Sequence, residues 1–401
     1  MTKIKVNSSS CNRVFRYLVA LSIVLVTICL NVDKSLAQKS VVDLSSSDSV
    51  KAGIVPLLGY TSDLGLVFGG MVSRTDMRGN VQPYRSHLQT MLIGSTKGHI
   101  EFRVKYDQTN TFGTNIRSSI SPYLERIYDA NYFGIGNNTP FSSTKWKNNY
   151  YQIQTVSFGF DYKGRKPLYE VKGSSRRLDL LFLGGAGYEI PYPGNGPKKF
   201  KISEPTGYKG GWVNYIGTGV QWENRNNEFI PTHGNKGSLT FKYAPGFLLS
   251  DYNIAWYKAS FTQYFKFHLI RDVVVAQRAM WNQVFGNAPF WRMAHLGDDQ
   301  TMRGYPYYRF LGKASLIYNL ELRTWLFSIP SLKIRIGGQL FMDSGKIFNN
   351  KENYHDFFGN FKETFGLGGA MSVFDKDFFV RGDLGFSQNM ARIYAGIGYA
   401  F

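Results

Sequence analysis

Cysteine is nearly absent from the 401-residue chain, which contains only Cys11 and Cys29. Both lie before residue 38, in a segment that the sequence predicts to be removed during export. A mature chain without cysteine excludes disulfides, zinc sites built on thiolates and cysteine nucleophiles. It also suits an oxidising periplasm, where stray thiols form unwanted disulfides.

Residues 1–37 have the three-part pattern of a secretory signal peptide. A basic head is followed by residues 17–30, a run of 14 without charge, and by small residues that end at Ala37, the predicted cleavage point. As a helix this run would span only ~21 Å, short of the ~30 Å hydrocarbon core, so a membrane anchor is the weaker alternative. Removal leaves 42 basic and 27 acidic residues, a net charge of +15.

Long hydrophobic runs are also missing. After residue 37, no uncharged apolar stretch approaches the ~18 residues that a transmembrane helix needs. The remaining route across a bilayer is a closed β-barrel, because backbone groups in lipid must pair within the protein. The 31 Phe, 26 Tyr and 42 Gly suit the aromatic girdles and turns of such a barrel. A soluble secreted β-sandwich, the alternative, would not need so many aromatic side chains facing outward.

The C-terminal residues 391–401 alternate as a half-buried strand does. Ile393, Ala395, Ile397, Tyr399 and Phe401 share one face, and small or polar residues occupy the other. An apolar outward face and an aromatic last residue are typical of the final strand of an outer-membrane barrel. The pattern therefore predicts export to the bacterial outer membrane.

The rest of the chain predicts a single 16-stranded antiparallel transmembrane β-barrel, an all-β fold, over residues 53–401, after a short periplasmic lead-in at 38–52. The even count and the alternation of tight turns with long loops match bacterial single-chain barrels. The long external loops are expected at 125–147, 191–210, 286–312 and 349–360. The predicted strands are 53–60, 64–75, 84–96, 98–108, 114–124, 148–163, 176–190, 211–225, 235–248, 253–267, 271–285, 313–327, 331–348, 361–374, 378–387 and 391–401.

The inward phase of these strands is mainly basic. Two interpretations stay open: ordinary solvation of a wet interior, or a lumen that attracts anionic segments or lipid headgroups. The residues predicted to face inward are Lys258, Lys266, Arg278, Arg323, Arg335, Arg381 and Arg392, against Glu321, Asp343 and Asp383.

The loop 286–312 contains the sequence Arg303-Gly304-Tyr305. Eighteen residues after Arg303, Glu321 is predicted to project inward from one strand, and Asp343 projects inward from the next, just before Gly345. If the loop folds into the barrel, the planar guanidinium can form paired hydrogen bonds with both carboxylates. Gly304 permits the sharp turn that this requires. The sequence therefore predicts an internal latch between the loop and the wall.

Four motifs make the chain resemble the barrel of the BamA/TamA family, the bacterial surface antigen superfamily of outer-membrane assembly and secretion factors. The resemblance is good over residues 220–401 and weaker elsewhere. The motifs are the turn from Asn224-Arg225-Asn226-Asn227 to Pro231-Thr232-His233-Gly234, the loop triplet Arg303-Gly304-Tyr305, the strand motifs Asn319-Leu320-Glu321-Leu322-Arg323 and Phe341-Met342-Asp343-Ser344-Gly345, and the closing Tyr399-Ala400-Phe401.

The resemblance implies protein insertion or transport, with first and last strands that part sideways. Gly396 and Gly398 would weaken that lateral seam, and Tyr399 and Phe401 would be read by the assembly machinery. Typical members carry periplasmic POTRA domains, each requiring at least about 50 residues, whereas only about 15 residues separate Ala37 from the first predicted strand. The expected partners are therefore the lipid bilayer, client outer-membrane or secreted proteins and a separate periplasmic partner, with no nucleic acid.

Two other functions stay open. A sixteen-stranded barrel is wide enough for a passive, anion-preferring channel, with Arg303 as a filter. A barrel enzyme would need an acid–histidine constellation, and His295 near Asp298 and Asp299 is the only local cluster. The six histidines are otherwise scattered without metal-ligand spacing, and no Gly-x-Ser-x-Gly elbow is present. We therefore expect no enzymatic activity, cofactor or metal.

Overall fold

The computed structural model describes residues 49–79, 81, 83–171, 174–196, 198–332, 334–349, 356–373, 379–388 and 390–401. The predicted signal peptide and most of the lead-in lie outside these residues. The first strand begins at Val50, three residues earlier than expected. The described residues form the barrel and its loops, and they contain no POTRA domain.

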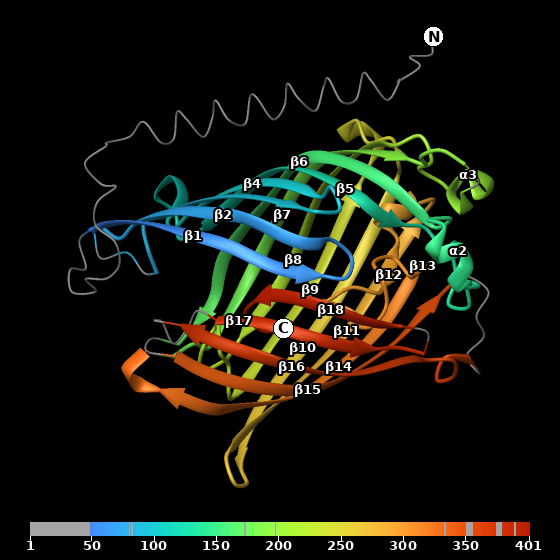
Figure 1. Cartoon of the computed structure of the whole chain (residues 1–401). Coiled ribbons are helices and arrows are strands. Elements are labelled where there is room, and N and C mark those ends of the chain that lie inside the picture. The colour runs from blue at the N-terminus through green and yellow to red at the C-terminus, as the bar shows by residue number, and fades with distance from the viewer. Residues whose placement is uncertain are drawn as a thin grey trace.

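Sixteen antiparallel strands follow one another around the barrel, each bonded to its neighbour in the sequence of the chain (Figure 1). The predicted all-β barrel and its strand number are confirmed. The strands are β1 (Val50–Thr61), β2 (Gly65–Asp76), β3 (Ser86–Ser95), β4 (Ile100–Gln108), β5 (Arg117–Asn131), β6 (Gln152–Glu170), β7 (Arg177–Tyr192), β8 (Gly211–Glu223), β9 (Gly234–Ala244), β10 (Ile254–His268), β11 (Asp272–Gly286), β14 (Ala314–Ile329), β15 (Ile334–Phe348), β16 (Lys362–Val373), β17 (Phe379–Phe386) and β18 (Ala391–Ile397).

The remaining elements are short and lie in the connections. Two three-residue strands, β12 (Ala294–Leu296) and β13 (Phe310–Gly312), pair with each other inside the β11–β14 connection. No helix in the described part of the chain is long and apolar enough to cross a membrane. The helices are α2 (Ser143–Lys147), α3 (Lys199–Ser203) and the 3-10 turns η1 (Thr111–Gly113), η2 (Gly246–Leu248), η3 (Phe290–Arg292) and η4 (Pro330–Leu332).

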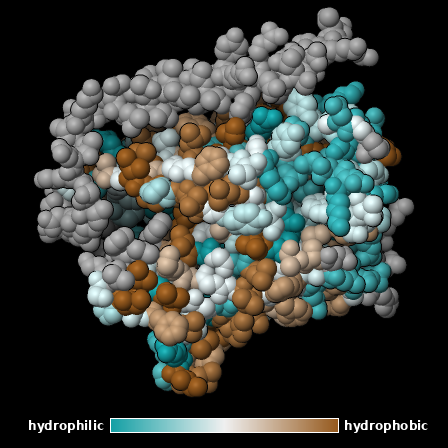
Figure 2. All heavy atoms as spheres, in the orientation of Figure 1, coloured by the Kyte–Doolittle hydropathy of each residue, from teal (hydrophilic) through white to brown (hydrophobic). Residues whose placement is uncertain are grey.

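Alternation along the strands separates an apolar outer face from a polar interior. In β16, Phe365 and Leu367 share the outer face and are both 53% exposed. Thr364, which points to the opposite face, is fully buried. In Figure 2, hydrophobic residues gather over the strands, and hydrophilic residues gather at the end that carries α2 and α3. This is the surface that a lipid-embedded barrel needs, since lipid contacts only the outward phase.

The predicted asymmetry between tight turns and long loops is present, but β5 and β6 each end seven residues later than expected, at Asn131 and Glu170. The β5–β6 ladder continues past a bulge between Ile127 and Ala130 and ends at the pair Asn131 and Gln152. The external loop that was expected at 125–147 is therefore displaced to 132–151. Backbone pairing sets the strand length here, and the bulge disrupts the alternation that a sequence pattern relies on.

The last strand differs from the prediction. β18 ends at Ile397, and Gly398 has a left-handed φ of +73°, which turns the chain away from the barrel wall. Tyr399 then lies over the guanidinium of Arg323, with its ring centroid 3.9 Å from Cζ. Phe401 lies over Arg278 at 4.6 Å. The expectation that Tyr399 and Phe401 continue the outward face is wrong, because attraction between their rings and lumenal arginines draws them inward.

Candidate functional site: the arginine cluster and the seam

The connection between β11 and β14 folds into the lumen. Its apolar residues pack in one buried cluster with inward side chains of β11, β14 and β15, and this fixes the loop against the barrel wall by burial of apolar surface. The cluster consists of Met280, Leu296, Met302, Tyr305, Phe310, Ile317 and Ile347.

Arg303 extends from this loop into a buried set of acids. Its side chain is 1% exposed, and Glu321 and Asp343 are fully buried. Arg303 Nη1 donates to Glu321 Oε1 at 2.6 Å, while Nε and Nη2 donate to the two oxygens of Asp343 at 2.9 and 2.8 Å. The guanidinium also lies 3.5 Å from the ring centroid of Phe341. The structure thus brings together Arg303, Glu321 and Asp343, with the forked geometry that only arginine provides.

Further charges complete the cluster. Asp383 on β17 lies 3.4 Å from Arg303 Nη1 and 3.1 Å from Arg381 Nη1. Arg323 Nε donates to the second oxygen of Glu321 at 2.7 Å. Three arginines therefore face three carboxylates on β14, β15 and β17. This balance matters because an unpaired charge in a shielded interior is costly.

Close backbone approach places the arginine at this position. Gly304 has a φ of +97°, and a Cβ there would lie 3.0 Å from the carbonyl carbon of Phe386. A Cβ at Gly345 would lie 2.8 Å from Met302 Sδ. Both positions that the motif analysis selected are therefore occupied by glycine for lack of space, and Gly304 for its backbone conformation as well.

Hydrogen bonds join the same loop to β18 and to the β17–β18 turn. Gly304 N donates to Tyr394 Oη at 3.0 Å, and Tyr394 Oη donates to the carbonyl of Tyr305 at 2.9 Å. Ser387 Oγ donates to the carbonyl of Gly304 at 2.8 Å. The arginine loop is thus bonded to the last strand as well as to the acids of the wall.

The first and last strands meet without forming a ladder. β1 and β18 are the two ends of the sheet order, and Ser62 N donates to the carbonyl of Ile393 at 2.8 Å just beyond β1. A Cβ at Gly59 would lie 3.1 Å from Ala395 Cβ, so the two strands approach closely at this point. Because β18 ends at Ile397, the start of β1 extends beyond it, and the two ribbons diverge toward that end in Figure 1.

The arginine loop also contacts the β1 side of this seam. Arg392 Nη2 donates to Asp63 Oδ1, and Tyr307 N donates to the same oxygen at 3.5 Å. Burial raises the pKa of Asp63, and the Arg392 guanidinium acts against this. Asp63 is in the β1–β2 turn, so one loop holds both strands of the seam.

The predicted seam glycines have other surroundings. Gly396 lies in β18, and a Cβ there would be 3.2 Å from Arg381 Nη2, toward the lumen. Gly398 lies beyond the strand, at the turn that takes Tyr399 and Phe401 inward. The glycine at the close approach between the strands is Gly59, which the sequence analysis did not single out.

Sequence reasoning also missed the roles of Asp383, Tyr394 and Ser387 around the arginine loop. The alternation of the strands does indicate that Asp383 and Tyr394 point into the lumen. Nothing in the sequence pattern indicated that either contacts Arg303 or its neighbours, because this depends on how far the loop descends into the lumen.

His295 and Asp298 do contact each other, with Nε2 3.0 Å from Oδ2. Asp298 Oδ1 accepts hydrogen bonds from the backbone N–H groups of Gln300 at 2.8 Å and of Thr301 at 2.5 Å. Burial acts in the opposite direction, but the bonds with His295 and Thr301 lower the pKa of Asp298. This pair therefore shapes the loop backbone immediately before Met302 and Arg303.

An Omp85 superfamily domain matches residues 94–400, so the chain belongs to this superfamily. Its barrels are transporters and assembly factors rather than enzymes, and membership implies an outer-membrane location. The resemblance to BamA/TamA barrels drawn from the motifs is thereby confirmed. No curated protein sequence shows a significant match to the chain.

Solved structures agree on the fold. A structure of BamA from Haemophilus ducreyi lacking POTRA domains 1–3 is 13% identical with a TM-score of 0.60, covering 86% of this chain and 70% of that one. CdiB from Acinetobacter baumannii is 10% identical with a TM-score of 0.52, over 88% of this chain and 65% of that one. CdiB from Escherichia coli is 13% identical with a TM-score of 0.53, over 87% of this chain and 62% of that one. The chain thus spans less than two thirds of either CdiB chain.

Proposed function

We propose that this barrel inserts or translocates client proteins at the outer membrane through the seam between β1 and β18. The observation that carries the proposal is the weak closure of that seam. β1 pairs with β2 over twelve residues, whereas two hydrogen bonds to the β18 backbone join it to the end of β1 in the described residues: Ser62 N to the carbonyl of Ile393, and Ile393 N to Ser62 Oγ. A backbone hydrogen bond contributes only about 0.5–1.5 kcal/mol net in water, so few contacts must break for the strands to part.

The free part of β1 is suited to receive a client strand. Its first half extends past the end of β18, and an unpaired strand edge is a template for another strand. Ile54 and Leu58 on β1 are 75% and 78% exposed, so the outward face there is ready for lipid or for a neighbouring client strand. Main-chain pairing would provide affinity without demanding a particular client sequence.

The arginine loop would couple the lumen to the seam. Arg303 is held by Glu321 and Asp343 in the wall, the adjacent Gly304 and Tyr305 bond to Tyr394 of β18, and Tyr307 bonds to Asp63 beside β1. Opening the seam requires at least one of these attachments to β1 or β18 to break. The loop therefore links the charged cluster in the lumen to opening of the seam, and the buried ion pairs hold it in the position from which it can do so.

We also propose a separate periplasmic partner that contacts the end of the barrel where β1 begins. Two turns at the end of the barrel where β1 begins present large apolar side chains to solvent: Phe112 is 97% exposed, and Ile270 is 94% exposed. Large apolar side chains exposed on turns at this end of the barrel are candidates for contact with another protein. Recognition of Tyr399 and Phe401 by an assembly machinery stays a prediction, and it must precede folding, since Arg323 Nη2 donates to the Phe401 carbonyl at 3.0 Å in the folded barrel.

The test follows the folding of an unfolded barrel client in liposomes that contain this protein. We expect acceleration by the wild type and its loss with Arg303→Ala, while Lys209→Ala, which removes an exposed cation from the β7–β8 connection, retains activity. A wild-type barrel that conducts ions steadily without accelerating client folding would refute the proposal and favour a passive channel. If client folding is accelerated only after a periplasmic extract is added, the barrel needs the separate partner.

A further inference from the structure

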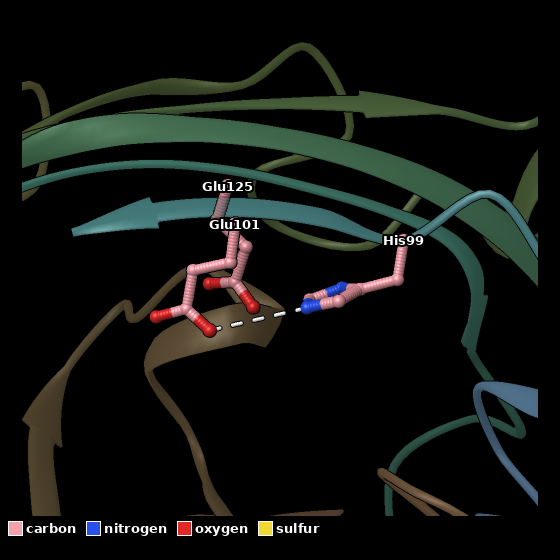
Figure 3. Close-up of side chains that lie close together, drawn as sticks. All are labelled: His99, Glu101 and Glu125. Carbon is pink, nitrogen blue, oxygen red and sulfur yellow. Dashed lines mark ion pairs between the residues drawn. The ribbon is translucent and has the colours of Figure 1, made fainter. Parts of the chain in front are cut away.

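Three side chains with metal-binding chemistry converge on the inner wall near the β3–β4 turn. His99 immediately precedes β4, Glu101 follows it by two residues on the same face, and Glu125 of β5 is the direct cross-strand partner of Glu101. One ligand atom from each residue lies within 4.8 Å of the other two. Figure 3 shows the His99 ring pointing toward the two carboxylates.

The two glutamates need a compensating charge. Like charges placed directly opposite on neighbouring strands are destabilising. Arg103 Nε donates to Glu101 Oε1 at 2.8 Å, which leaves Oε2 directed toward His99. One arginine therefore balances only one of the two carboxylates.

The His99 ring is the second, independent indication of a ligand. Its side chain is only 5% exposed, and Nε2 lies 3.9 Å from Glu101 Oε2, beyond hydrogen-bonding distance. Nδ1 is buried without a hydrogen-bond partner. A buried ring nitrogen without a hydrogen bond, as Nδ1 is here, loses its hydration without replacement, and the other nitrogen of the same ring is aimed at the carboxylates.

We propose that His99, Glu101 and Glu125 bind a divalent transition-metal ion. Imidazole together with carboxylates suits zinc or manganese, whereas calcium and magnesium prefer oxygen ligands alone. With metal–ligand bonds of about 2.0 Å, tetrahedral ligands stand about 3.3 Å apart. His99 and Glu101, 3.9 Å apart, therefore need to approach by about 0.6 Å, and the three ligand atoms, which lie within 4.8 Å of one another, by at most about 1.5 Å. Three protein ligands leave a position for water, and the ion supplies the missing positive charge.

Bound metal would fasten the β3–β4 turn to β5 within the wall. Sequence reasoning rejected a metal site because the histidines are scattered. The His-x-Glu spacing does place two ligands on one face of a strand, but the third ligand is set by the register between β4 and β5, which the spacing does not reveal. This inference is independent of the proposed insertion of client proteins.

The test titrates zinc chloride, and separately manganese chloride, into the EDTA-treated, tag-free barrel in detergent, with binding followed calorimetrically. We expect one equivalent to bind, and His99→Gln or Glu125→Gln to weaken binding at least about 10-fold, since even outer-shell changes at metal sites cost about 10–100-fold. Glu125→Gln also removes the opposed carboxylates, so the variant is expected to fold.

Two matched variants serve as controls: His87→Gln, whose Nδ1 already bonds Thr75 Oγ1 at 2.8 Å, and Glu189→Gln on β7. Both should bind metal as the wild type does. Absence of stoichiometric binding of either ion to the folded wild type would overturn the proposal. Binding that is unchanged in both His99→Gln and Glu125→Gln would overturn it as well, because the ion would then occupy a different site.

Discussion

Replacing Arg303 with alanine should destabilise the barrel more than any exposed substitution. Asp343 would lose two charge-assisted hydrogen bonds and keep those from Arg303 N at 3.0 Å and Asn319 Nδ2 at 2.8 Å. Glu321 would keep Arg323, and Asp383 would keep Arg381. Asp343 is therefore the carboxylate that loses its ion pair, and breaking a buried ion pair in this way costs about 3–5 kcal/mol.

The free energy of unfolding is measurable by urea titration in lipid vesicles, with the fluorescence of the 7 tryptophans as the signal. Lys209→Ala in the exposed β7–β8 connection is the control and should change stability by less than about 1 kcal/mol. Adding Asp343→Asn to Arg303→Ala removes the orphaned charge, so the double variant should be more stable than the sum of the two single losses predicts, with a coupling of about 0.5–3 kcal/mol. An Arg303→Ala barrel that unfolds with the wild type would refute this account of the cluster.

Two further substitutions test the loop attachment. Gly304→Ala places a Cβ too close to Phe386 at a left-handed backbone position, so the barrel should lose more unfolding free energy than the roughly 1–3 kcal/mol expected for backbone strain alone. Gly113→Ala is the control, because Gly113 has a φ of +73° and nothing within 4 Å of its Cβ position, so it should show the strain alone. Urea unfolding compares the two variants. Tyr394→Phe removes the hydroxyl that bonds Gly304 and Tyr305 and should cost about 1–3 kcal/mol and expose the loop to proteolysis, while the matched Tyr106→Phe on an outward face should not; equal cleavage of both variants would contradict the proposed attachment.

Much of the barrel was predictable because alternation directly reports which side of a strand faces lipid. In β14, the inward residues Asn319, Glu321 and Arg323 are only 2%, 0% and 2% exposed, whereas the outward Leu322 is 40% exposed. Arg303 and its two main acids were also predictable, since inward acids on consecutive strands must lie close to one another once the loop enters the lumen.

The remaining features depend on three-dimensional closure. Period-two alternation gives a face but neither the register nor the point where a strand stops, so the bulge near Ile127 and the inward turn after Ile397 were not predicted. The contact between Gly304 and Tyr394 joins residues 90 apart and depends on the depth of the loop. The pairing of Glu101 with Glu125 likewise depends on the register of β4 and β5.

The central claim is that β1 and β18 part during function, and a reversible crosslink across them tests it most directly. Gly59→Cys with Ala395→Cys places two cysteines at the closest approach of the strands, where Cβ atoms 3.1 Å apart need to separate by only a few tenths of an ångström to reach the ~3.5–4.5 Å of a disulfide. Each single cysteine variant is the control. We predict that the oxidised double variant stays folded but no longer accelerates client folding in liposomes, and that a reductant restores the activity. Full activity in the oxidised, crosslinked barrel would contradict the account.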